Sequence, residues 1–204
     1  MFLVGRYCLE CERLGYHRPA QQFPVRRAPA AGAYNPLSPV IQKKIALLGA
    51  AGVGKTSLVR RFVESLFDET YLTTIGVKVD KKSVRVGEVD LSLMLWDLAG
   101  AEEHFTVPSS YVRGASGCLL VADTTRPETF TVALELVRQI DRDLGGAIPC
   151  VLAVNKTDLA GSTGIDPPGL DALRPHARSI VPTSAKTGEG VDAAFMRLAE
   201  ALVG

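Results

Sequence analysis

The chain has 204 residues and a formal net charge of +1; 47% of the residues are apolar and 22% are charged. This length suits one domain with a sizeable core, and no apolar run approaches the roughly 20 residues that span a bilayer. The apolar residues 1–4 are followed at once by Gly5 and Arg6, so we expect a cytoplasmic protein without a secretory signal.

The first 42 residues differ in composition from the rest of the chain and are predicted to be a flexible N-terminal extension. They hold five prolines among Ala, Gly and Arg, without a sustained apolar period, which is typical of extended or disordered chain. Residues 1–44 have seven Lys or Arg and two Glu, a net charge of +5, whereas residues 45–204 carry −4. We interpret the basic segment as a solvated tail. It lacks interleaved aromatic residues, so we expect no nucleic-acid partner.

The four cysteines divide into two kinds. Cys118 and Cys150 lie in apolar runs and are predicted to be small buried hydrophobic side chains. Cys8 and Cys11 form a CxxC with His17 nearby. A structural zinc site normally has four ligands, so these three candidates favour a CxxC without metal, and local metal binding is the alternative.

From residue 43 to residue 204, short apolar runs alternate with amphipathic segments and predict one domain. Strands are predicted at 44–48, 77–86, 89–96, 117–122, 149–154 and 179–181, and helices at 55–66, 127–144 and 191–202. Gly87 and Glu88 separate two alternating runs and indicate a hairpin. Thr125 is predicted to cap the middle helix, and Leu66 to lie on the apolar stripe of the first. This alternation predicts an α/β sandwich with a mostly parallel sheet.

The loop after the first predicted strand carries the strongest motif. Gly49 and Gly54 bracket four residues and are followed by Lys55 and Thr56, matching GxxxxGK[ST] between a strand and a helix. Glycines let backbone N–H groups point at phosphates, and the helix N-terminus adds partial positive charge. We expect Lys55 to reach the terminal phosphates and the Thr56 hydroxyl to bind Mg²⁺.

A second motif after a later strand selects the base. It reads Asn155, Lys156, Thr157 and Asp158. A carboxylate at Asp158 can accept two hydrogen bonds from the N1–H and amino group of guanine, whereas adenine would leave that carboxylate unpaired. Asn155 can bond the other edge of the ring, and the stem of Lys156 can lie against the base. The segment 184–186 after the next strand can offer a backbone N–H to the guanine carbonyl.

Two further loops contain residues suited to sensing the terminal phosphate. Asp97 follows the strand that ends at Trp96, where it can hold Mg²⁺ through water, and the Gly100 N–H can meet the terminal phosphate. The hydroxyl of Thr74 can be a second Mg²⁺ ligand. We expect all these loops to lie at the carboxyl ends of the strands.

With these motifs in order, residues 43–203 resemble a Ras-superfamily small GTPase, nearest the Rab branch. The resemblance implies a P-loop NTPase three-layer sandwich: a mostly parallel six-stranded sheet with one antiparallel edge strand and helices on both faces. It also implies that Phe67 packs on guanine, that Tyr71 covers the nucleotide, and that segments 67–76 and 97–113 are switches contacted by effectors and regulators. The nucleotide-binding residues expected on motif and resemblance are Gly49, Ala51, Gly52, Val53, Gly54, Lys55, Thr56, Ser57, Phe67, Tyr71, Thr74, Asp97, Gly100, Asn155, Lys156, Asp158, Ser184, Ala185 and Lys186. Catalysis is expected from Lys55, Thr74 and Gly100, and Mg²⁺ binding from Thr56, Thr74 and, through water, Asp97.

The sequence departs from the family pattern at two places that bear on function. Ala101 stands where the family has a glutamine that orients the attacking water, so slow unaided hydrolysis is predicted. The alternative is that Glu102, Glu103, His104 or a residue of a partner replaces that glutamine. The chain also ends directly after its last predicted helix without a cysteine, so no prenyl anchor is expected, which suits a prokaryotic or otherwise soluble relative.

The predicted function is therefore a Mg²⁺-dependent GTP/GDP switch that hydrolyses GTP slowly. One alternative is a binding module that holds GTP and rarely hydrolyses it, which Ala101 favours. The other is an ATP-using P-loop protein, which Asp158 opposes.

Overall fold

One six-stranded sheet with helices on both faces forms the domain. The computed structural model describes residues 40–66, 76–98, 107–146, 148–159 and 169–204. In these residues the strands are β1 (Ile41–Leu48), β2 (Val77–Val86), β3 (Val89–Leu98), β4 (Gly117–Asp123), β5 (Cys150–Asn155) and β6 (Ser179–Pro182). The helices are α1 (Lys55–Glu64), α2 (Ser109–Val112), α3 (Glu128–Leu144), α4 (Leu170–Leu173) and α5 (Val191–Ala201), with 3₁₀ turns at Thr157–Leu159 and Arg174–His176.

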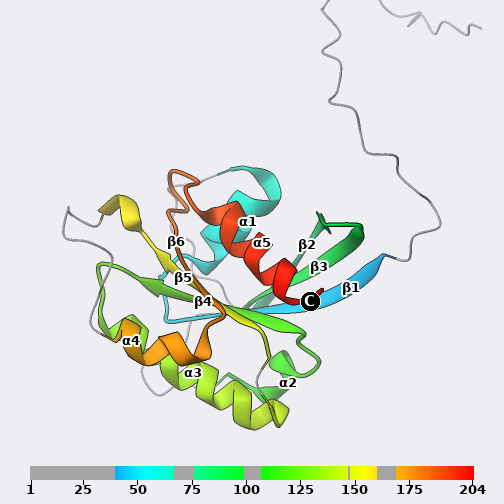
Figure 1. Cartoon of the computed structure of the whole chain (residues 1–204). Helices are drawn as coiled ribbons and strands as arrows, with labels where there is room; N and C mark the ends of the chain where they lie inside the picture. Colours follow the sequence, from blue (N-terminus) through cyan, green and yellow to red (C-terminus); the bar gives the residue numbers. More distant parts are fainter. Residues whose placement is uncertain (1–39, 67–75, 99–106, 147, 160–168) are drawn as a thin grey trace, which may run out of the picture. The chain divides into compact units, whose positions relative to one another are not determined.

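The sheet order is β2-β3-β1-β4-β5-β6 (Figure 1). The first two strands in this order form an antiparallel hairpin, in which Val77 pairs with Leu98 and Val86 with Val89. Every other neighbouring pair is parallel. The predicted fold class, a mostly parallel six-stranded sheet with one antiparallel edge strand, is therefore confirmed.

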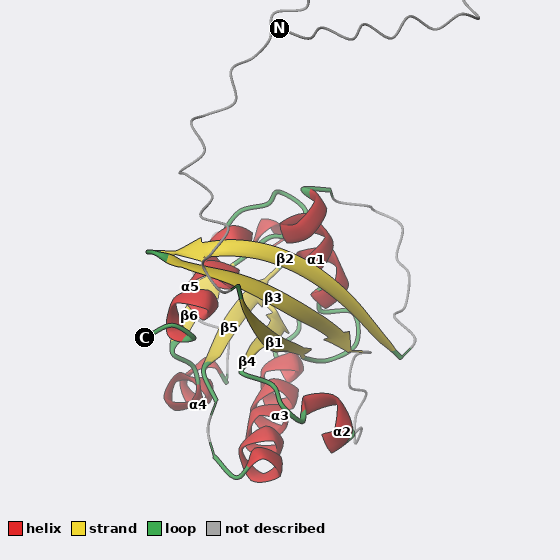
Figure 2. Ribbon diagram, turned by 90° about the vertical axis from the view of Figure 1, so that its right-hand side faces the viewer, coloured by secondary structure: helices red, strands yellow, loops and turns green. Residues whose placement is uncertain are grey.

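Alternation along the central strands divides the core into two layers. In β1, Ile45 and Leu47 are buried on the side of α1 and α5, whereas Ala46 and Leu48 are buried on the side of α3 and α4. Figure 1 and Figure 2 show these helix pairs on opposite faces of the sheet. Because both faces are covered, the parallel strands are continuously apolar, which is why they were recognisable in the sequence.

Two local predictions were wrong. The first helix ends at Glu64, because Ser65 adopts a left-handed conformation with φ 59°, so Leu66 lies beyond the helix and is 57% exposed. Thr125 does not cap α3; its N–H and hydroxyl bind the side chain of Asp123 instead. The short helices α2 and α4 were not predicted, since four residues are too few to show a helical period.

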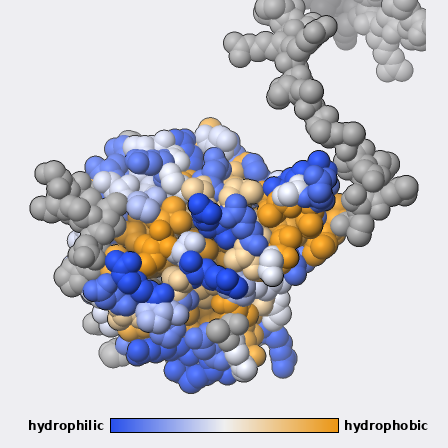
Figure 3. Space-filling model, in the orientation of Figure 1, coloured by the Kyte–Doolittle hydropathy of each residue, from blue (hydrophilic) through white to orange (hydrophobic). Residues whose placement is uncertain are grey.

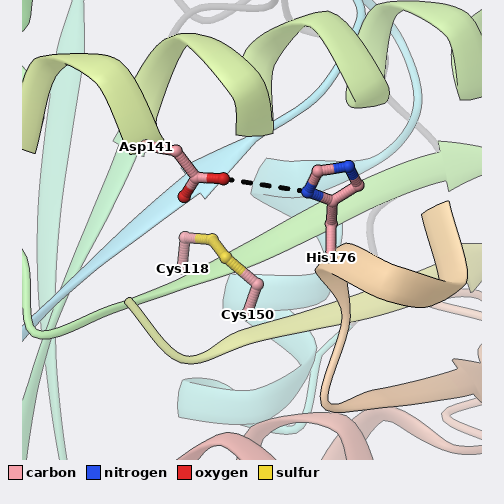
Figure 4. Close-up of a disulfide and its surroundings, with 4 residues drawn as sticks. All are labelled: Cys118, Asp141, Cys150 and His176. Carbon is pink, nitrogen blue, oxygen red and sulfur yellow. Dashed lines mark ion pairs between the residues drawn. A yellow bond between two sulfur atoms is a disulfide. The ribbon is translucent and has the colours of Figure 1, made fainter. Parts of the chain in front are cut away.

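Cys118 and Cys150 are buried, as predicted, but they are joined in a disulfide that was not predicted (Figure 4). They are direct partners in the parallel register of β4 and β5, so the bond links two central strands. Beside it, His176 Nδ1 lies 3.7 Å from Asp141 Oδ2, joining the 3₁₀ turn before β6 to α3 (Figure 4).

The surface mixes charged and apolar residues (Figure 3). Among the exposed large apolar side chains are Val40, Ile41 and Val203. In the part of the chain that the structure describes, no helix is both long and apolar enough to cross a membrane.

Candidate functional site

Five parallel strands end at the same edge of the sheet, and each is followed by polar residues. This edge carries the loop after β1, Asp97 at the end of β3, Asp123 at the end of β4, Asn155 at the end of β5 and the segment 183–186 after β6. Open α/β sheets bind ligands outside these carboxyl ends. The described parts of the predicted motifs therefore meet at one edge, as expected.

The loop from Gly49 to Thr56, here called the phosphate loop, folds tightly against β4 and β5. Gly54 has φ 100°, in the left-handed region, and a Cβ on it would collide with the amide of Asn155. Gly49 is also confined, because a Cβ there would meet the carbonyl of Val121. These two glycines are needed for close approach of the loop to the sheet as well as for its curvature. Of the other binding residues predicted in this loop, Ala51 is exposed, Gly52 and Thr56 are half-buried, and Val53 is buried; Ser57, in α1, is half-buried.

Lys55 is turned into the loop, with 6% of its surface exposed. Its Nζ donates hydrogen bonds of 3.0 Å to the carbonyls of Gly49 and Ala50. Burial lowers the pKa of Lys55 to about 8, partly offset by the negative charge of Asp97. The loop therefore encloses a lysine whose positive charge is disfavoured by burial, and an anion in the loop would stabilise that charge.

Thr56 and Asp97 form a hydrogen-bonded pair of oxygen-bearing side chains beside this lysine. The Thr56 hydroxyl donates to Asp97 Oδ2 at 2.5 Å, while Asp97 Oδ1 is buried and has no hydrogen-bond partner among the residues that the structure describes. Burial raises the pKa of Asp97, although Thr56 and Lys55 oppose the shift. A buried carboxylate oxygen of this kind is suited to bind a cation, and hydroxyl and carboxylate oxygens suit Mg²⁺.

Asn155 is the first residue of the base loop, here residues 155–158. It connects this loop to the phosphate loop and to the segment after β6. Its Nδ2 donates to the carbonyl of Val53 at 2.8 Å, and its Oδ1 accepts from the Ala185 N–H at 3.1 Å and the Thr183 hydroxyl at 3.3 Å. The backbone N–H of Ala185, one donor expected to face the guanine carbonyl, is thus bonded to Asn155 here. The motif residue Asn155 holds the phosphate loop against the segment after β6, in addition to any contact with a base.

The other residues predicted to contact the base, Asp158 and the segment 184–186, lie around Ser184. Ser184 is fully buried, and its hydroxyl donates to Asp158 Oδ1 at 2.6 Å. The carboxylate of Asp158 is exposed, which leaves it accessible to a ligand. Lys186 is also exposed, whereas Ala185 is buried.

A carboxylate that was not predicted, Asp123, holds Lys156. Asp123 is fully buried, and its Oδ2 lies 2.7 Å from Lys156 Nζ and 3.0 Å from Arg126 Nε. Burial alone would raise the pKa of Asp123, but hydrogen bonds from Lys156, Thr125 and Arg126 outweigh it and lower the pKa. An acidic residue directly after a buried strand, as at Asp97, was the signal in the sequence that could have identified it.

Several predicted residues lie outside the described part of the chain. They are Phe67, Tyr71, Thr74, Gly100 and Ala101, together with Cys8, Cys11 and His17. The two expected switches, 67–76 and 97–113, are described only at Gly76, at residues 97–98 and at residues 107–113.

The fold and the glycine-bracketed lysine loop at the carboxyl edge define a P-loop nucleotide-binding domain. The Ras family model matches residues 44–203. The chain is 35% identical over 158 residues to the Ras-related protein Rab-10 of Diplobatis ommata, covering 77% of this chain and 79% of that protein. It is 35% identical over 157 residues to the Ras-related protein Rab-13 of Bos taurus, covering 76% and 77%. The chain belongs to the Ras family: it is a Rab-like small GTPase.

Proposed function

We propose that residues 43–204 act as a Mg²⁺-dependent GTP/GDP switch whose unaided hydrolysis is slow. The observation that carries this proposal is the pairing of Thr56 with Asp97 beside the buried Lys55. Together they offer one cation and two oxygen ligands at the edge where the base loop also ends. Bound Mg²⁺ would neutralise phosphate charge, and Thr56 and Asp97 would hold it.

Guanine selectivity rests on Asp158 in this proposal. The Ser184 hydroxyl bonds one oxygen of its carboxylate and so orients it, while the exposed carboxylate can accept from the N1–H and amino group of guanine. Asn155 keeps this loop in register with the phosphate loop through Val53. Phe67 and Tyr71 would cover the base and the nucleotide, and the segments 67–76 and 97–113 would present the bound state to effectors and regulators.

Hydrolysis requires a water positioned in line with the γ-phosphate. In this proposal Lys55 stabilises the developing charge, and the backbone N–H of Gly100 and the hydroxyl of Thr74 close on the γ-phosphate. The methyl group of Ala101 cannot hydrogen-bond the water. The chain alone would therefore stay in its GTP state for long, and a partner would supply what Ala101 lacks.

Single-turnover hydrolysis of GTP by the purified chain tests this proposal. We expect Ala101→Gln to hydrolyse bound GTP at least tenfold faster than the natural chain, as a restored water-orienting residue should. Ala51→Gly serves as a comparison in the same active-site region that adds no hydrogen-bonding group. Fast turnover by the natural chain, or equal rates for it and Ala101→Gln, would contradict the proposed effect of Ala101.

The alternative is a module that holds GTP without hydrolysing it in practice, which Ala101 also favours. The nucleotide that co-purifies with the chain separates the two, because mostly GTP would support the stalled module and mostly GDP a working hydrolase. Competition with ATP tests the base assignment. If ATP displaced bound GTP at similar concentrations, the role of Asp158 would be wrong.

A further inference from the structure

Arg126, at the turn between β4 and α3, bridges two parts of the site that are far apart in the sequence. Its Nη2 donates to the carbonyl of Ala51 in the phosphate loop at 2.9 Å, and its Nε donates to Asp123 Oδ2 at 3.0 Å. The same carboxylate oxygen binds Lys156 Nζ of the base loop at 2.7 Å. A continuous chain of hydrogen bonds thus runs from the phosphate loop through Arg126 and Asp123 to the base loop.

The turn that carries Arg126 is fixed by its own hydrogen bonds. The Arg126 N–H donates to the carbonyl of Asp123 at 3.0 Å. The buried hydroxyl of Thr129 accepts from the Asp123 N–H at 2.9 Å and donates to the Arg126 carbonyl at 2.7 Å. The backbone therefore fixes the point from which the guanidinium reaches out, and the side chain, which is 38% exposed, is held by its two acceptors on Ala51 and Asp123.

The chemistry of the bridge favours arginine over lysine. A guanidinium has N–H donors in a rigid fork, so Nε and Nη2 can bind acceptors on two different elements at once. Its charge also acts on the phosphate loop: burial is the main cause of the lowered pKa of Lys55, and the positive charge of Arg126 lowers it further. A cation this close to the loop favours an anionic ligand there.

We propose that Arg126 is a positioning residue for nucleotide retention, which holds the phosphate loop in register with the base loop through Asp123. A nucleotide spans both loops, so separating them should speed its release. This inference rests on the proposed binding of guanine nucleotide. It adds a residue that belongs to neither the GxxxxGK[ST] motif nor the NKxD motif.

Release of a fluorescent GDP analogue from the full chain, chased with excess GDP, tests the inference. We expect Arg126→Ala to release the analogue about tenfold faster, the effect of losing charge-assisted hydrogen bonds. Arg126→Lys should fall between the natural chain and Arg126→Ala, because one ammonium cannot keep both acceptors. Arg138→Ala, an exposed arginine on α3, is the matched control and should release the analogue at the natural rate.

A coupling experiment distinguishes positioning from a general loss of structure. Asp123→Asn should itself speed release, and adding Arg126→Ala to it should change the rate less than Arg126→Ala does in the natural chain. An equal effect in both backgrounds would show that Arg126 does not act through Asp123. The unfolding temperature of GDP-loaded Arg126→Lys monitors folding, and this variant carries the test if Arg126→Ala does not fold.

The outcomes separate this inference from the proposed function. If the natural chain fails to bind the analogue, the proposed nucleotide binding is overturned and the role of Arg126 with it. If the natural chain binds the analogue but Arg126→Ala, or Arg126→Lys when it carries the test, releases it at the natural rate, only the inference about Arg126 is overturned.

Discussion

At the scale of single residues, Lys55 links nucleotide binding to pH. Burial lowers its pKa to about 8 in the structure, whereas phosphates beside it would keep it protonated. Binding should therefore take up a proton when the pH exceeds about 8, and affinity for GDP should fall by up to tenfold per pH unit above that value. Below it, Lys55 is already charged and this dependence should vanish.

Calorimetry of GDP binding in buffers of different ionisation enthalpy measures this proton uptake. We expect little uptake by Lys55 at pH 7 and close to one proton at pH 9. Proton uptake that is the same at both values would contradict the role assigned to the buried ammonium.

The buried carboxylate of Asp97, which we propose as a metal residue, should lower the free energy of unfolding of the nucleotide-free chain. Its buried Oδ1, which no described residue hydrogen-bonds, and its raised pKa mean that the charged form destabilises the nucleotide-free fold. Asp97→Asn should raise the free energy of unfolding of the nucleotide-free chain by roughly 1 kcal/mol at pH 7. Because the folded-state pKa is raised, this gain should disappear as the pH falls towards the ordinary aspartate value of about 4.

Denaturant unfolding at pH 7 and pH 4 provides the measurement, and Glu135→Gln at an exposed position of α3 serves as a control. The same Asp97→Asn protein should lose the slowing of nucleotide release by Mg²⁺. A variant that is less stable at pH 7 yet still responds to Mg²⁺ would argue against Asp97 as a metal residue.

At the scale of elements, α1, which directly follows the phosphate loop, packs on α5. Phe62 and Phe195 stack with ring centroids 4.1 Å apart and planes 7° apart, and both are buried. Phe195→Ala should lower the free energy of unfolding by about 3–5 kcal/mol, whereas Phe195→Leu, which keeps most of the volume, should cost less than about 1.5 kcal/mol. Thermal unfolding compares them, and equal losses would contradict the expectation that retained volume at position 195 preserves most of this packing.

The elements also show what the sequence could and could not predict. The β2–β3 hairpin and the central strands were predictable, because period-two alternation and continuous apolar runs report directly on burial. The end of α1 was not, since the left-handed conformation of Ser65 depends on tertiary context. The disulfide was not either, because only the register of β4 and β5 brings Cys118 and Cys150 together.

The candidate site likewise contains residues that the sequence could predict and residues that it could not. The glycines, Lys55, Asp97 and Asn155 are marked by short spacings next to predicted strands, so sequence alone indicated them. Arg126 could not be predicted, because its contact with Ala51 joins residues 75 positions apart and depends on the shape of one turn. Motifs identify residues that touch a ligand more readily than those that hold such residues in place.

At the scale of the whole molecule, the proposed ligand would complete the carboxyl edge of the sheet. This edge contains a buried ammonium at Lys55 and a buried carboxylate oxygen at Asp97 that no described residue hydrogen-bonds. A nucleotide with Mg²⁺ would satisfy both and would connect the loops after β1, β3, β5 and β6. Stability should therefore depend on ligand far more than the apolar core alone would suggest, since a ligand at 1,000 times its Kd stabilises the folded state by about 4 kcal/mol.

Removing the metal from the GDP-loaded chain tests this dependence. Chelation with EDTA should lower the unfolding temperature and speed GDP release, and added Mg²⁺ should restore both, because the metal then again offsets the negative charges of Asp97 and the phosphates. ADP at the same concentration should give no such stabilisation, since adenine does not offer Asp158 the adjacent N1–H and amino donors of guanine. Equal stabilisation by GDP and ADP would contradict the base assignment, and an unfolding temperature unaffected by EDTA would contradict the metal site. The proposed base site and the proposed metal site are therefore tested independently.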